Sequence, residues 1–217
     1  MSAAVAEVLG LGGYALALAA GAAALCASLV TRRRRWLIAV ALGAAALGVA
    51  VPVGGIPLAG YPRGMSGDLS ITTLALLTAA LSAMLAGRPL LERPEWRGLC
   101  ELAAACGVVG YPLTLGLTVL DPYELGYRPC GLVLVVAGLV VAWWWRRRGA
   151  ALVLASGVAA FDLRLLESSN LWDYLLDMPL ALCSVGIVAA RAVTWRRAPI
   201  ALRAPAPATR RSPERQS

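Results

Sequence analysis

Arginine clusters alternate with apolar segments along this chain, and the alternation limits what it can fold into. A transmembrane helix needs about 20 mostly apolar residues, with a range of roughly 17–25. Seven segments approach that length, at approximately 8–30, 36–53, 70–86, 99–120, 130–145, 150–166 and 178–195. Composition agrees, since 59% of the residues are hydrophobic and 15% are charged, against about 45–50% and about 25% in soluble domains. The sequence therefore predicts an all-α, polytopic transmembrane helix bundle.

The arginines also predict how the chain is threaded. All 20 basic residues are Arg, and 17 of them fall in alternate connections or in the C-terminal tail. The other connections hold only Arg63, Arg128 and Arg164. The positive-inside rule then places the N-terminus outside and the C-terminus in the cytoplasm, as seven spans require. Six spans, with 150–166 re-entrant, would put the basic tail outside, so we prefer seven spans in a bacterial inner membrane.

The two ends of the chain carry different signals. Glu7 precedes the first apolar segment and the basic run Thr31–Arg35 follows it, which is the reverse of a signal peptide. We therefore expect an uncleaved first span. Residues 198–217 are rich in Pro, Ala and Arg and predict a disordered basic cytoplasmic tail. The expected division is a helix bundle over 1–197 and a tail over 198–217.

Missing residue types exclude several kinds of chemistry. The chain has no Lys and no His, so it lacks a Schiff-base amine and an imidazole base. The five cysteines form no C-x-x-C pair, and we expect them to be free packing residues. No motif for a cofactor or a metal is present. The positive charge is explained by membrane topology, so nucleic acid is not an expected partner.

Polar side chains gather in three connections that the threading places outside. The first runs from Gly54 to Ser70, the second from Asp121 to Pro129 and the third from Asp162 to Asp177. We expect a polar site there, and its candidate residues are Arg63, Asp68, Asp121, Glu124, Arg128, Asp162, Arg164, Glu167, Trp172 and Asp173.

Asp162 is the most unusual of these candidates. If the sixth span begins at Ala150, Asp162 lies about 18 Å into a core of about 30 Å. A carboxylate at that depth needs a partner or a polar cavity, and Arg63 or Arg128 could supply the partner. Arg164 points to another face of the helix and can instead reach Glu167 or Ser168.

Structural roles compete with functional ones for several acids. Asp68 could cap the third span, or it could join Arg63 in a polar site. Asp121 precedes a proline and is typical of a turn. Asp177 is expected to cap the last span, with Pro179 in the first turn. Alternatively, Asp173 and Asp177 form an exposed carboxylate pair.

The sequence leaves three functions open. The first is a small accessory or assembly protein whose outer polar loops bind a membrane protein or a lipid-linked partner. The second is an outer-face enzyme that acts on a lipid or lipid-linked sugar, with carboxylates as acid and base and arginines as a phosphate clamp. The third is a proton- or cation-coupled transporter that uses Asp162.

Overall fold

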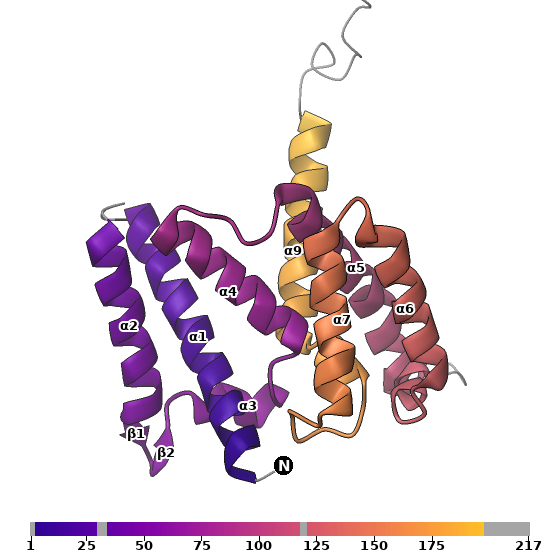
Figure 1. The fold of residues 1–217 in the computed structure, drawn as a ribbon. Helices are drawn as coiled ribbons and strands as arrows, with labels where there is room; N and C mark the ends of the chain where they lie inside the picture. Colours follow the sequence, from indigo (N-terminus) through magenta and orange to yellow (C-terminus); the bar gives the residue numbers. More distant parts are fainter. Residues whose placement is uncertain (1–2, 30–33, 118–120, 198–217) are drawn as a thin grey trace, which may run out of the picture.

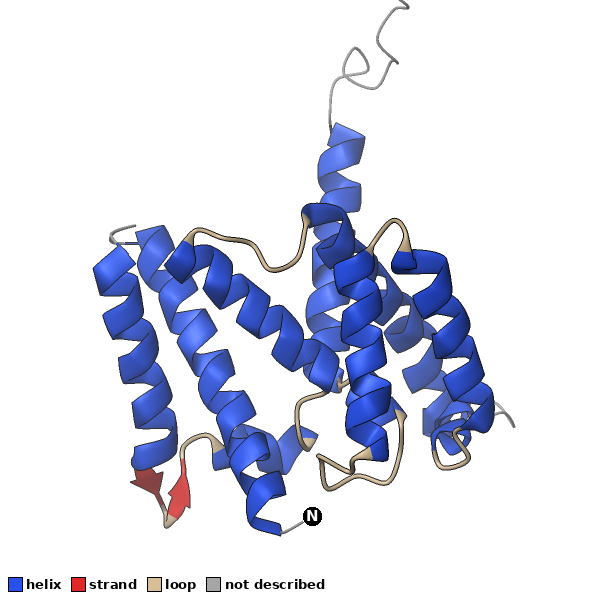
Figure 2. Cartoon of the chain, viewed as in Figure 1, coloured by secondary structure: helices blue, strands red, loops and turns tan. Residues whose placement is uncertain are grey.

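The computed structural model describes residues 3–29, 34–117 and 121–197, and this part of the chain is all-helical. The predicted tail, 198–217, lies outside the described residues. Figure 2 shows that helices account for nearly all of the regular structure. The long helices are α1 (Ala3–Leu29), α2 (Arg34–Ala50), α4 (Ile71–Ala86), α5 (Arg93–Pro112), α6 (Cys130–Trp144), α7 (Arg148–Asp162) and α9 (Met178–Arg197).

Short elements connect the long helices. Two of them, β1 (Pro52–Val53) and β2 (Ile56–Pro57), form an antiparallel hairpin. Its turn requires positive φ at Gly54 and Gly55, which glycine adopts without strain. The helical connections are α3 (Gly60–Ser66), the π-helical turn η1 (Leu113–Leu117), the 3₁₀ helix η2 (Pro122–Gly126) and α8 (Trp172–Leu175).

Each of the seven predicted apolar segments coincides with a long helix, although several bounds differ. The first helix begins at Ala3, five residues earlier than predicted, and the second ends at Ala50, three residues earlier. The segment predicted at 99–120 begins earlier, at Arg93, and its α-helical part ends at Pro112 before η1. The segment predicted at 150–166 ends at Asp162, because the chain turns at Arg164 with a positive φ of 51°. This last difference moves Asp162 from the inside of a helix to its end.

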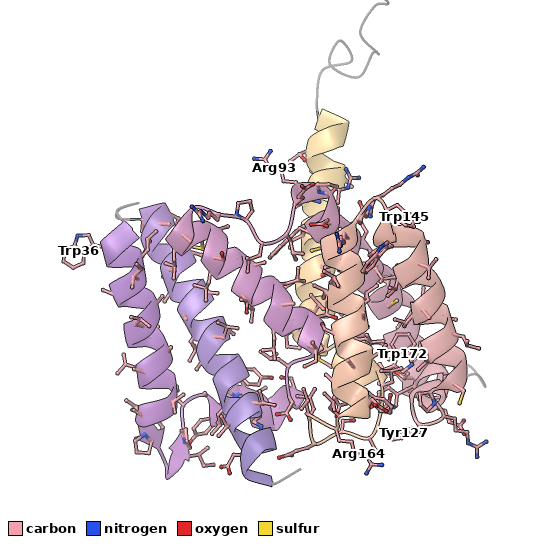
Figure 3. All side chains as sticks on the ribbon, in the orientation of Figure 1. Trp36, Arg93, Tyr127, Trp145, Arg164 and Trp172 are labelled. Atoms are coloured by element: carbon pink, nitrogen blue, oxygen red, sulfur yellow. The ribbon has the colours of Figure 1, made fainter. Side chains whose placement is uncertain are left out.

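The long helices alternate in direction, so their connections gather at two ends of the molecule (Figure 1). One end holds the hairpin, α3, η2 and α8, and we call it the α3 end. The opposite end holds the connections 87–92 and 145–147, and we call it the arginine end. In Figure 3, Trp36, Arg93 and Trp145 lie toward the arginine end, whereas Tyr127, Arg164 and Trp172 lie toward the α3 end.

Within the described residues, two helices are long and apolar enough, by length and composition, to cross a membrane. They cover Glu7–Leu29 and Arg93–Gly116. Four others are apolar but shorter, at Trp36–Ala50, Ile71–Ala86, Cys130–Trp144 and Met178–Thr194. Helix α7 has 15 residues, which span about 22 Å at 1.5 Å per residue.

Helix α4 joins two groups of helices. On one side it packs against α1 and α2, where Leu81 meets alanines of both helices. On the other side it packs against α7 and α8, and Leu76 enters the larger core formed with α5, α6 and α7. Figure 1 shows α4 running between α1 and α7. The larger core also contains Tyr174, which is fully buried.

A buried carboxylate joins two helices at each end of the molecule. At the arginine end, Glu95 of α5 accepts hydrogen bonds from the backbone N–H groups of Glu92, at 2.8 Å, and Gly149, at 2.5 Å. At the α3 end, Asp177 accepts from the N–H of Ser70 at 2.7 Å and of Leu180 at 2.6 Å. Each acid therefore satisfies free amides at two helix starts, where the helix dipole also favours a negative charge.

Candidate functional site

A cleft of about 1000 Å³ opens at the α3 end. Its walls come from the start of α1, from β2 and α3, from α5 and η1, from η2, and from the segment 166–178. Residues that are far apart in the sequence therefore meet around one cavity. We call it the α3 cleft.

Arg63 of α3 makes the first polar contact in the cleft. Its Nε donates to Asp68 Oδ1 at 2.6 Å, and its Nη2 donates to Glu167 Oε1 at 2.9 Å. Hydrogen bonding to Asp68 raises the pKa of the Arg63 guanidinium above its ordinary value. The Arg63 and Asp68 side chains are 19% and 10% exposed, whereas Glu167 is 63% exposed. Arg63 thus links the α3 connection to the connection after α7.

Tyr14 of α1 holds the end of α3 in place. Its hydroxyl contacts Ser66 Oγ at 2.5 Å and donates to the carbonyl of Gly67 at 2.9 Å. Ser66 Oγ in turn donates to the carbonyl of Pro62 at 3.0 Å. These bonds fix the turn between Arg63 and Asp68, so the ion pair is positioned by a buried tyrosine.

Asp173 makes the second polar contact in the cleft. The Tyr123 hydroxyl donates to both Asp173 oxygens at 3.0 Å, and Ser168 Oγ donates to Oδ2 at 2.5 Å. Burial raises the pKa of the Tyr123 phenol, and the negative charge of Asp173 raises it further. The carboxylate is therefore held between two donors from different connections.

Asn170 attaches this connection to η2. Its side chain is fully buried, donating to the carbonyl of Tyr123 at 3.0 Å and accepting from the N–H of Trp172 at 2.9 Å. The Trp172 indole then donates to the carbonyl of Pro122 at 2.8 Å. Gly126 lies so close to Asn170 and Trp172 that a Cβ there would overlap both. The aromatic wall of the cleft is thus rigidly placed.

Asp177 has the capping role that its position before Pro179 predicts. It is 6% exposed and caps α9 through the N–H of Leu180. It also accepts from the Thr73 hydroxyl at 2.5 Å. Ser70, and not Asp68, caps α4, with its side chain accepting from the N–H of Thr73. Asp173 and Asp177 therefore have separate hydrogen-bond partners and do not form an exposed pair.

The ten predicted site residues divide into three groups. Five of them line the α3 cleft: Arg63, Asp68, Glu167, Trp172 and Asp173. Asp121 accepts from the N–H of Tyr123 at 2.9 Å and caps η2. The remaining four are exposed and do not line the cleft: Glu124, Arg128, Asp162 and Arg164.

The expectation for Asp162 is corrected by the structure. Its side chain is exposed at the last residue of α7, and no ion pair joins it to Arg63 or Arg128, both of which are described. The expected contact of Arg164 with Glu167 is also replaced, because Glu167 binds Arg63. The physical reason is the turn at Arg164, because of which the helix ends at Asp162 and does not continue to Glu167.

The sequence did not predict several residues that line the cleft or hold its walls in place. Tyr14, Ser66 and Ser168 act through contacts between distant segments, for which a single sequence holds no signal. Asn170 and Gly126 had a weak signal, since both residue types are common in turns. Apolar wall residues such as Leu11 and Cys106 lie in apolar helical segments whose sequence does not distinguish them from their neighbours.

The charges in the cleft favour some ligands over others. Among its described lining residues are five carboxylates, those of Glu7, Asp68, Glu167, Asp173 and Asp177, and one guanidinium, that of Arg63. Within the described residues, no group of three His, Cys, Asp or Glu side chains converges as a metal site would need. The cleft combines an acidic polar side with apolar walls, which suits one amphiphilic molecule.

Comparison of the chain with known protein families, with curated proteins and with solved structures finds no significant match.

Proposed function

We propose that the chain is an integral membrane protein of a bacterial inner membrane, with seven spans, an outer N-terminus and a cytoplasmic C-terminus. The surface of the described helices supports this, because large apolar side chains such as Leu134, Val135 and Leu182 are 67–73% exposed. Polar side chains such as Ser70 and Asn170 are buried instead. Exposed apolar patches of this kind match a lipid environment.

The arginine distribution supports the same orientation. Arg88 and Arg146 are exposed in connections at the arginine end, and Arg93 is exposed at the start of α5. This end would face the cytoplasm. Helix α7 is short, but it packs against four other elements, α4, α5, α6 and α8. An interior helix needs less apolar surface than one that faces lipid. The α3 end, with its cleft, would then face outward.

We propose that the protein acts as an accessory factor that binds an amphiphilic, lipid-linked molecule in the α3 cleft. The observation that carries this proposal is the cleft itself, in which acidic and aromatic side chains meet apolar walls at a helix end. An acyl chain would lie along α1 and α5, near Leu11 and Cys106. A polar head group would lie against Arg63 and Asp173.

Electrostatics limit the head group. Arg63 already donates to two carboxylates, so a phosphate would have to displace Glu167 and approach four further acids. Like charges in a partly desolvated cleft repel strongly. A head group rich in hydroxyls, or one that carries an ammonium, would instead donate to the carboxylates and pack on Trp172.

The hydrogen bonding favours binding over catalysis. Asp177 is engaged by the N–H groups of Ser70 and Leu180, and Asp173 is held by Tyr123 and Ser168. A general acid or base has to exchange its proton with the substrate, and such engaged carboxylates serve better as fixed acceptors.

An enzyme acting on a lipid-linked sugar is the second candidate, and Glu167 favours it. This carboxylate is 63% exposed beside Arg63 and is free to turn toward a ligand. Turnover of a bound glycolipid that Glu167→Gln abolishes would support the enzyme. The transporter has no comparable support, because Asp162 lies at a helix end.

Filling the cleft tests the binding proposal. Gly110 lines it, and a Cβ at this position meets no atom within 4 Å, so Gly110→Trp can be built into α5 and would occupy the cavity. Gly138 of α6 is equally open but lies away from the cleft, so Gly138→Trp is the matched control. We expect Gly110→Trp to lose a co-purifying amphiphile that the control retains. Equal retention by both variants would overturn the proposal.

A further inference from the structure

A second groove, of about 650 Å³, lies at the arginine end. One wall is the alanine face of α4, formed by Ala79, Ala80 and Ala83. The connection before α5 and the first turn of α5 form the other wall, and Arg191 of α9 completes it. We call it the arginine groove.

Positive charge dominates the arginine groove. Arg93, Arg97 and Arg191 line it, all three are exposed, and no carboxylate is among its described lining residues. Glu101 neutralises one of them, because Arg97 Nε donates to its carboxylate at 2.6 Å. The two terminal guanidinium nitrogens of Arg97 remain without a recorded partner within the described chain.

The other acids on these elements do not compete for the arginines. Glu95 is buried and is held by the N–H groups of Glu92 and Gly149. Glu92 is exposed at the start of α5 and does not line the groove. The groove therefore keeps a net positive charge of about two, which suits a phosphate group.

The remaining walls suit an acyl chain and an interfacial head group. The small alanines leave a smooth apolar surface along α4. Trp96 is half-buried in the lining, and indoles favour the head-group level of a bilayer. Figure 3 shows Arg93 at the end of the molecule opposite Trp172, which under the proposed orientation is the cytoplasmic end. Basic pockets between helices on that side bind anionic lipid head groups.

We propose that the arginine groove binds an anionic phospholipid of the inner leaflet, with its phosphate held by Arg93, Arg97 and Arg191 and an acyl chain along the alanines of α4. The proposal rests on the membrane orientation proposed above, and it is independent of the ligand in the α3 cleft. Arg146 gives a natural comparison, because it is exposed at the same end and does not line the groove.

Native mass spectrometry of the full chain, titrated with phosphatidylglycerol and with phosphatidylcholine, tests this proposal. We expect phosphatidylglycerol to bind preferentially. The double variant Arg93→Gln with Arg191→Gln should weaken its binding by about tenfold or more, from roughly fivefold for each charge near the head group. Arg146→Gln should leave it unchanged. Equal weakening by Arg146→Gln, or equal binding of the two lipids, would overturn the proposal.

A second variant removes the acyl-chain surface without changing any charge. Ala83→Trp would fill the groove, and Ala137→Trp on the exposed face of α6 is its control. We expect only Ala83→Trp to lose phosphatidylglycerol. Inorganic phosphate tests whether the groove binds a lipid head group or free phosphate. If phosphate alone raises Tm as much as phosphatidylglycerol does, the groove binds free phosphate and the lipid proposal is wrong. Gly110→Trp should leave phosphatidylglycerol binding intact, which separates this test from that of the α3 cleft.

Discussion

Replacing Asp177 should destabilise the fold more than any exposed acid, because this one carboxylate joins α4 and α9. One of its oxygens accepts from the N–H of Leu180, and the other accepts from the N–H of Ser70 and the hydroxyl of Thr73. All three donors are on buried residues. In Asp177→Ala the donors lose their acceptor, and water cannot easily replace it.

The expected magnitude follows from these three bonds. Loss of the α9 cap costs about 1 kcal/mol. The Ser70 N–H is left buried without an acceptor, which costs about 1–3 kcal/mol. The Thr73 hydroxyl adds little, because it can donate to Ser70 Oγ, which is 3.1 Å away. The free energy of unfolding should therefore fall by about 2–4 kcal/mol, which lowers Tm by roughly 4–16 °C for a chain of this size.

Cys100 provides the assay. It is free and 2% exposed, whereas Cys130 and Cys183 are free and exposed. In a background in which the other four cysteines are replaced, a thiol-reactive fluorophore would therefore report the temperature at which this buried part of α5 becomes accessible. Asp162→Ala is the matched control, because that acid is exposed and has no recorded hydrogen bond within the described chain. The control should melt within about 2 °C of the wild type, since surface substitutions change stability by about 0.5 kcal/mol or less. An Asp177→Ala protein that melts with the control would refute the capping role.

Further predictions concern the α3 end. Because burial and Asp173 raise the pKa of Tyr123 above 10.0, the phenol should ionise later than a free tyrosine in an absorbance titration, and Asp173→Asn should lower its pKa. Because the pKa is raised in the folded state, the stability that Tyr123 contributes is fully present below about pH 10 and is lost as the pH rises through the folded-state pKa. The free energy of unfolding of Tyr123→Phe should therefore depend less on pH in the alkaline range. Gly126→Ala should lower Tm by several degrees because its Cβ would overlap Asn170, whereas Gly131→Ala, in open space on α6, should not; equal thermal melts would contradict the close contact. Met65 is 90% exposed at the α3 end, so Met65→Cys in a cysteine-free background should react in intact cells with a membrane-impermeant maleimide, and labelling only after lysis would contradict the orientation.

The helices were predictable because apolar length and arginine position are local properties of the sequence. All seven segments were found, but the end of α7 was not. Leu163, Leu165 and Leu166 continue the apolar run, so the sequence gives no reason for a turn at Arg164. The turn depends on tertiary contacts. The Tyr174 hydroxyl accepts from the backbone N–H of Leu166 and donates to its carbonyl, which holds the segment after α7 against the buried Tyr174.

The candidate site was predictable only in part, for a similar reason. Arg63 and Asp68 are five residues apart, and their pairing was one of the two interpretations of that connection. Glu167 is 104 residues from Arg63, and Asp173 is 50 residues from Tyr123. Such pairs are decided by how connections fold over the helix ends, which residue spacing does not encode.

Native mass spectrometry of the protein, released gently from its own membrane, tests the central claim most directly. The proposed function predicts one bound amphiphile whose head group is not anionic, retained by the wild type and by Gly138→Trp and lost from Gly110→Trp. An anionic phospholipid in the arginine groove is expected in all three proteins and is counted separately. A stoichiometric protein partner in place of the non-anionic amphiphile, or retention of that amphiphile by all three proteins, would contradict the proposed function.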